Sequence, residues 1–181
     1  MKKIIIFLII FLNYEIVNAA CDFIIDIGEK KNKIVNKFAE PLPILDELSM
    51  LPIPSPKLCP GDSLDERIAV EYMFLGDNLA AIRMLVLNDG SNKISNKLLL
   101  MNYAKKNFGD FDTGENPLLY NNFYAWEKNG KIIVYQRLLG SDGFINEEIY
   151  ISNDEYDFKL GSFYNAVSYT HLTLPTSWLV G

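Results

Sequence analysis

Histidine and cysteine, which serve many enzymes as base, nucleophile or metal ligand, are scarce in this chain. The chain has one histidine, His171, and two cysteines, Cys21 and Cys59. This count excludes a zinc site built from histidine and cysteine ligands. His171 lies in a C-terminal segment that we interpret below as foreign, so no imidazole base remains for a Ser-His-Asp or Cys-His mechanism. Phosphate-loop, dinucleotide and metalloprotease motifs are absent as well, and we predict no catalytic residue, cofactor or metal.

Carboxylates are the other groups that could support catalysis. A small hydrolase using carboxylates or a bound metal would draw on four acids, Glu71, Asp110, Asp112 and Glu127. Such acids act together only where two of them face each other across a concave pocket. Glu147 and Glu148 are adjacent, and neighbouring residues on a strand point to opposite faces of a sheet, so this pair is not expected to converge.

The first twenty residues have the layout of a secretory signal peptide. A positive head, Met1–Lys3, precedes an apolar run over Ile4–Leu12, and the following stretch from Asn13 ends in the small residues Ala19 and Ala20. The apolar run is too short to anchor a chain across a bilayer. We therefore predict that residues 1–20 are removed on export and that the protein is periplasmic or extracellular.

Cys21 has two alternative fates after cleavage. An exported chain meets an oxidising compartment, which favours a disulfide between Cys21 and Cys59. A bacterial lipoprotein instead carries lipid on the cysteine that directly follows a box of small residues, here Val17–Ala20. The two fates exclude each other, and the protein contacts a membrane only if Cys21 is lipidated.

The C-terminal segment, residues 166–181, differs in composition from the rest of the chain. It contains no charged residue and, from Val167 onward, none of the Ile, Asn, Lys and Phe that are frequent before it. Residues 166–176 resemble the translation of a transposon-based sequencing adapter. This resemblance implies a non-native tail, a native reading that ends near Asn165, and a missing natural C-terminus.

Composition and charge are those of an acidic globular protein. Hydrophobic residues make up 49% and charged residues 22% of the 181 residues, and the formal net charge is -6. The length favours one domain, and we place it at residues 21–165. The negative charge argues against nucleic acid as a partner, because a binder must neutralise phosphates with a basic surface.

The first half of this domain is predicted to contain a helix, a proline-rich connector and a hairpin. The helix covers Glu29–Ala39, and the connector over residues 41–60 holds six of the eight prolines. Strands over Ile68–Leu75 and Leu79–Leu87 flank a three-residue turn. In this register Glu71 faces Arg83, which predicts a cross-strand ion pair.

The second half is predicted to contain a helix, three strands and a final helix, over residues 96–107, 123–127, 131–138, 144–151 and from Asn153 onward. Asn129-Gly130 is a strong signal for a two-residue hairpin turn between the first two of these strands. The resulting order is αββ and then αβββα. We expect an α+β fold of antiparallel hairpins with the helices packed on one face.

One face of the second hairpin is predicted to be aromatic and apolar, through Tyr124, Trp126, Ile133 and Tyr135. Exposed, it would be a binding surface for protein or carbohydrate. Buried, it would be the core under the helices. We favour burial, because a domain of this size needs its aromatic side chains for its core.

The segment Gly28–Pro41, a short helix followed by a proline, resembles an element of the small periplasmic lipoproteins that support outer-membrane barrel assembly. Members of that family place a helix on an antiparallel sheet, so the resemblance implies an envelope protein. Our first hypothesis is therefore an exported, non-enzymatic module that binds an unknown envelope protein. The alternatives are the carboxylate hydrolase and a small apolar-ligand or lipid carrier, which would show a closed apolar cavity between sheet and helix.

Overall fold

The computed structural model describes residues 23–59, 64–87, 98–115, 117 and 120–170, with side chains as far as residue 165. The predicted signal peptide, Cys21, His171 and most of the predicted foreign tail lie outside these residues. In the described ranges, no helix is both long and apolar enough to cross a membrane.

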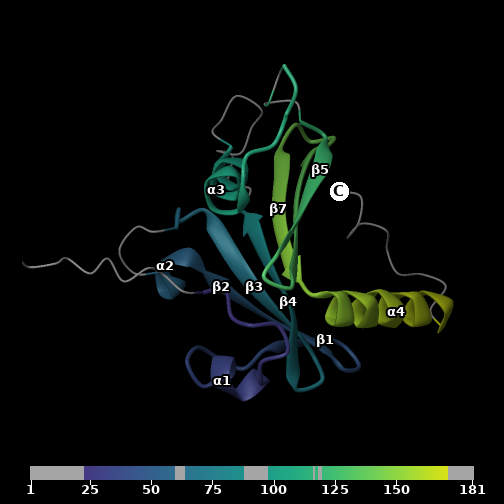
Figure 1. Ribbon diagram of the computed structural model, residues 1–181. Coiled ribbons are helices and arrows are strands. Elements are labelled where there is room, and N and C mark those ends of the chain that lie inside the picture. Colours follow the sequence, from purple (N-terminus) through teal and green to yellow (C-terminus); the bar gives the residue numbers. More distant parts are fainter. Residues whose placement is uncertain (1–22, 60–63, 88–97, 116, 118–119, 171–181) are drawn as a thin grey trace, which may run out of the picture.

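Seven strands form one sheet in which all neighbouring strands are antiparallel (Figure 1). The spatial order is β1-β2-β3-β4-β7-β6-β5. The strands are β1 Leu42–Leu45, β2 Leu48–Pro54, β3 Ile68–Leu75, β4 Asn78–Val86, β5 Asn122–Lys128, β6 Lys131–Leu139 and β7 Ile145–Ser152. The helices are α1 Lys31–Val35, α2 Ser55–Leu58, α3 Leu99–Phe108 and α4 Asp154–Thr170. The predicted α+β class with antiparallel strands is confirmed.

The proline-rich segment was predicted to be a connector, and this was wrong. It forms a third hairpin, β1–β2, followed by the short helix α2. Its prolines fit a sheet because of where they lie. Pro43 is in the outermost strand, and Pro52 and Pro54 lie where β2 extends past its last pair with β1, at Met50. Proline lacks the N–H that an inner strand would need, so it is tolerated at such an edge.

The predicted register of the β3–β4 hairpin is confirmed, although its turn differs. Glu71 pairs with Arg83, and Leu75 pairs with Asn78 around a two-residue turn in which Gly76 has a φ of 58°. A register shift between Met73 and Phe74 leaves one extra residue in β4. This residue compensates for the turn, which is one residue shorter than the predicted three-residue turn. A bulge of this kind leaves the register of the rest of the hairpin unchanged.

The helices pack on both faces of the sheet, so the prediction that they share one face was wrong. α3 contributes Leu100 and Met101 to a large core on one face. α4 contributes Leu160 to a smaller core on the other face (Figure 1). The second core forms because β3 and β4 also carry apolar residues on their outer face, Met73 and Ala81 among them. The alternation of apolar residues along the predicted strands had assigned only one face of the sheet to the core.

Candidate functional site

The adjacent glutamates of β7 point to opposite faces of the sheet, as the alternation of a strand requires. Glu147 is 2% exposed and lies on the face covered by α3. Glu148 lies on the opposite face and pairs with Arg83 of β4, 2.8 Å away. The two carboxylates therefore do not form a catalytic pair, in agreement with the sequence analysis.

Glu147 caps the N-terminus of α3. Its carboxylate accepts hydrogen bonds from the backbone N–H groups of Leu100 at 3.3 Å and Met101 at 3.2 Å. The hydroxyl of Tyr135 on β6 donates a third hydrogen bond to it, at 2.9 Å. α3 has no side-chain cap from its own preceding residue, Leu98. A carboxylate from a neighbouring strand thus satisfies donors that the start of a helix leaves unpaired, and its charge suits the helix dipole.

Arg137 on β6 is the buried counter-charge of Glu147. The two residues are direct cross-strand partners, and Nε of Arg137 lies 3.9 Å from Oε1 of Glu147. Arg137 is 1% exposed, and its Nη1 donates to the carbonyl of Pro117. Nε and Nη2 are buried without a hydrogen-bond acceptor among the described residues. Burial lowers the pKa of Arg137, and it raises the pKa of Tyr135 and of Glu147.

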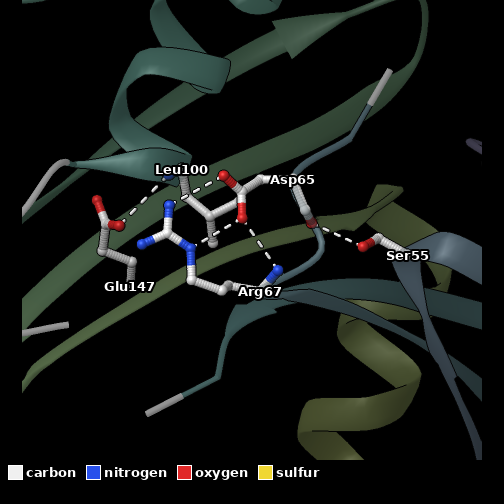
Figure 2. A network of polar contacts seen from close by, with 5 residues as sticks. All are labelled: Ser55, Asp65, Arg67, Leu100 and Glu147. Atoms are coloured by element: carbon white, nitrogen blue, oxygen red, sulfur yellow. Dashed lines mark hydrogen bonds and ion pairs between the residues drawn. The ribbon is translucent and has the colours of Figure 1, made fainter. Parts of the chain in front are cut away.

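A second polar cluster links α2 to the start of β3. Arg67 donates from Nε and Nη2 to the carboxylate of Asp65, at 2.9 and 3.0 Å. The buried hydroxyl of Ser55 donates to the backbone carbonyl of Asp65 at 2.6 Å. Figure 2 shows this cluster in one view with Glu147 and the start of α3. These contacts hold the loop that precedes β3 against α2.

The raised pKa of Glu147 predicts a pH-dependent stability with a defined sign. Burial raises its pKa above 4.5, so the folded protein binds this proton more tightly than the unfolded chain does. The free energy of unfolding of the wild type therefore gains a contribution as the pH falls toward 4.5, and Glu147→Gln lacks it. Urea unfolding at several pH values measures the difference between the two proteins. We expect the free energy of unfolding of the wild type, minus that of Glu147→Gln, to grow as the pH is lowered toward 4.5, and a constant or shrinking difference would contradict this assignment.

On the outer face, the predicted ion pair of Glu71 and Arg83 is present, with 3.1 Å between Oε2 and Nη1. Glu148 completes a triad across three strands by accepting from Nε and Nη2 of Arg83, at 3.2 and 2.8 Å. Burial raises the pKa of Glu71. Burial alone would lower the pKa of Arg83, but the contacts with Glu148 and Glu71 raise it. Sequence analysis did not predict the contact of Glu148 with Arg83, because β4 and β7 are neighbours in space and not along the chain.

The four acids proposed for a hydrolase lie on β3, on the loop after α3 and on β5. Glu71 is paired with Arg83, Asp110 lies 3.4 Å from Lys105, and Asp112 accepts from the backbone N–H of Gly114. In the part of the chain that the structure describes, no three histidine, cysteine or acidic side chains could together hold a metal ion. The geometry therefore gives the hydrolase alternative no support.

The carrier alternative finds no support in the described residues either. Between α3 and the sheet, side chains such as Leu100, Ala104 and Tyr135 fill the space with no exposure to solvent. A surface pocket of about 310 Å³ lies beside α1 and β1. It is open and lined by polar groups, including Lys31, Glu47 and Asp77, unlike the closed apolar cavity that a carrier needs.

The four residues of the predicted aromatic face are partly buried and partly exposed. Ile133 and Tyr135 are buried in the core, Trp126 is half-buried against it, and Tyr124 is 39% exposed. Phe111, which sequence analysis did not single out, lies among the aromatic rings. Its ring centroid is 5.0 Å from that of Tyr124, 5.4 Å from Trp126 and 5.5 Å from Tyr135. The face is thus core on β6, while its outer part on β5 remains accessible.

β5 is an edge strand with exposed side chains on both faces. Of its residues only Trp126 is half-buried, and Phe123 is 63% exposed. Leu138 and Leu139 at the end of β6 add further exposed apolar side chains. The outer side of β5 has no partner strand among the described residues. Among the described residues, β5 is thus a sheet edge that carries exposed aromatic side chains.

Cys59 is buried in the main core, next to α2. Its predicted partner, Cys21, lies outside the described residues, so the disulfide and the alternative lipidation of Cys21 both stay predictions. No family model, curated protein or solved structure matches this chain. Function must therefore be argued from the geometry of the molecule.

Proposed function

We propose that the chain is an exported, non-enzymatic module that binds another protein chain through the open edge of β5. The observation that carries this proposal is the strand itself. Its seven residues, Asn122–Lys128, contain no proline and expose side chains on both faces. Edge strands offer unpaired N–H and C=O groups to an incoming chain, and proteins ordinarily protect them.

The opposite edge of the same sheet shows such protection. β1 is only four residues long, contains Pro43 and directly follows Pro41. The exposed stretch of β2 beyond it carries Pro52 and Pro54. Proline cannot donate to an added strand, so this edge resists pairing with another chain. The contrast between the two edges supports a binding role for β5.

The sequence supports an extracytoplasmic location for this module. The leader over residues 1–20 favours export, and the acidic mature chain favours a protein partner over nucleic acid or anionic lipid. We place the partner in the cell envelope, where an exported chain would meet it. Contact with the membrane is expected only if Cys21 carries lipid.

Site-specific photocrosslinking in producing cells tests this proposal. A photoreactive phenylalanine analogue replaces Phe123 on β5 or, as a matched control, Leu42 on β1. The two side chains are almost equally exposed, at 63% and 60%. We expect a covalent adduct with a protein chain at position 123 and little at position 42, on molecules whose intact mass lacks residues 1–20.

Equal yields at the two positions, or no adduct at position 123, would contradict binding through β5. An intact mass that retains the leader would contradict export. An adduct at position 123 supports the proposal whether the captured chain is a different protein or a second copy of this one.

A further inference from the structure

We propose that the occupant of the β5 edge is a second copy of this chain, paired antiparallel about a two-fold axis at Ala125. This inference rests on the proposed function, because it names the chain that binds the edge identified there. The resulting dimer would have one continuous sheet that runs through both molecules. The inference is carried by the hydrogen-bonding geometry of β5 and by the order of its side chains.

The hairpin turn fixes which backbone groups of β5 point away from β6. Lys128 and Lys131 close a two-residue turn in which Asn129 and Gly130 have φ values of 53° and 69°. The first and last residues of such a turn are hydrogen-bonded to each other. Hydrogen-bonded and non-hydrogen-bonded pairs alternate along an antiparallel ladder. The N–H and C=O groups that point away from β6 are therefore those of Phe123, Ala125 and Glu127, and of these the N–H of Phe123 donates to Oδ1 of Asn122 at 2.9 Å.

An axis at Ala125 uses all of these groups. Ala125 is the middle residue of the strand, so this register pairs the whole of Asn122–Lys128 with its symmetry mate. Phe123 then pairs with Glu127 of the second copy, and Ala125 pairs with itself. About six main-chain hydrogen bonds would form, two for each hydrogen-bonded pair, and the N–H of Phe123 would exchange Oδ1 of Asn122 for the carbonyl of Glu127 in the second copy. Any register shifted along the strand leaves part of β5 unpaired.

The side chains of β5 complement each other in this register. Tyr124 lies opposite Trp126 of the second copy on one face, and aromatic cross-strand pairs of this kind are favourable. Phe123 lies opposite Glu127, and Asn122 lies opposite Lys128, so no like charges face each other. A shift that placed the axis at Glu127 would set two carboxylates directly opposite, which is unfavourable. Alanine at the axis places only a small side chain opposite its own symmetry mate.

The charges next to β5 leave the edge accessible. The ammonium group of Lys128 donates to the carbonyls of Asn107 and Phe108 at the end of α3, at 3.3 and 3.1 Å. Lys131 is paired with Asp26 at 3.0 Å. Both lysines are thus engaged within their own chain, and their positive charges offset part of the acidic net charge near the two-fold axis.

Sedimentation equilibrium of the full chain tests the dimer, with variants at the axis. We expect the wild type to sediment at twice the chain mass and Ala125→Pro at one chain mass. The N–H of Ala125 points away from β6, so proline removes no bond within the hairpin. Ala125→Val keeps the N–H and should remain a dimer. A wild type that stays at one chain mass at high concentration would overturn the inference.

Cysteine crosslinking tests the axis without relying on proline. Hydrogen-bonded antiparallel partners have Cα atoms about 5.5 Å apart, within the range of a disulfide. Ala125→Cys should therefore form a covalent dimer on mild oxidation, and Leu42→Cys on the other edge should not. Mixed Phe123→Cys and Glu127→Cys chains should crosslink to each other faster than either does to itself.

Equal crosslinking of Ala125→Cys and Leu42→Cys would overturn the inference. So would a wild type at one chain mass whose position 123 captures only a different protein. That second result would leave the proposed function intact. The absence of any adduct at position 123 would contradict both the dimer and the proposed function.

Discussion

Glu147→Ala is expected to destabilise the protein by about 3–5 kcal/mol, a large part of the stability of a single domain. The substitution leaves the positive charge of Arg137 buried without its counter-charge, 3.9 Å from where the carboxylate was. It also removes the acceptor for two backbone N–H groups of α3 and for the hydroxyl of Tyr135. Each buried donor left unpaired adds a cost of roughly 1–3 kcal/mol before relaxation. Chemical denaturation measures the loss.

Glu148→Ala is the matched control, because it removes the same group from the neighbouring residue. Arg83 keeps its second partner, Glu71, at 3.1 Å, and the triad is partly open to solvent. We expect Glu148→Ala to lower the free energy of unfolding by about 1 kcal/mol. Similar losses for the two variants would show that Glu147 does not hold the start of α3 in the way described.

The registers of the two hairpins could be predicted because they depend on residues close together in the sequence. The turn Asn129-Gly130 fixes the pairing of Trp126 with Ile133 and of Tyr124 with Tyr135, and the structure has both pairs. The predicted turn over residues 76–78 placed Glu71 opposite Arg83, and the structure pairs the two residues. Local turn chemistry and a period of two residues are sufficient for such pairs.

The pairing of β4 with β7 could not be predicted in this way. The two strands are separated by α3, β5 and β6, and only the packing of the whole chain makes them neighbours. The triad on the outer face and the capping of α3 by Glu147 both depend on that neighbourhood. The β1–β2 hairpin was missed for a different reason, since a high proline content normally argues against strands.

A signal for the buried charges was nevertheless present in the sequence. Glu147 alternates with Ile145 and Ile149, so it occupies a core position of its strand. Arg137 is likewise in step with Ile133 and Tyr135 on β6. A charged residue on the apolar face of a strand is rarely buried unless it is paired. Following that alternation would have predicted a buried pair of opposite charges.

Trp126→Ala is expected to destabilise the protein by about 2–3 kcal/mol, the second large effect. The indole is half-buried against the main core, and its ring lies 5.4 Å from Phe111, 5.8 Å from Phe108 and 4.7 Å from Tyr124. Truncation opens a gap under the end of α3, where the indole also lies against Gly109. Phe123→Ala, on the other face and exposed, should change stability by less than about 0.5 kcal/mol.

Both substitutions are best measured by chemical denaturation in the Ala125→Pro background, so that association through β5 does not contribute to the free energy of unfolding. In that background, a large decrease in the free energy of unfolding of Trp126→Ala means that the indole is part of the core. Unchanged unfolding of Trp126→Ala, together with lost binding when Ala125 is restored, would mean that Trp126 is a contact residue. The aromatic side chains of β5 would then serve binding on both faces of the strand, and the core would end at Tyr135 and Phe111.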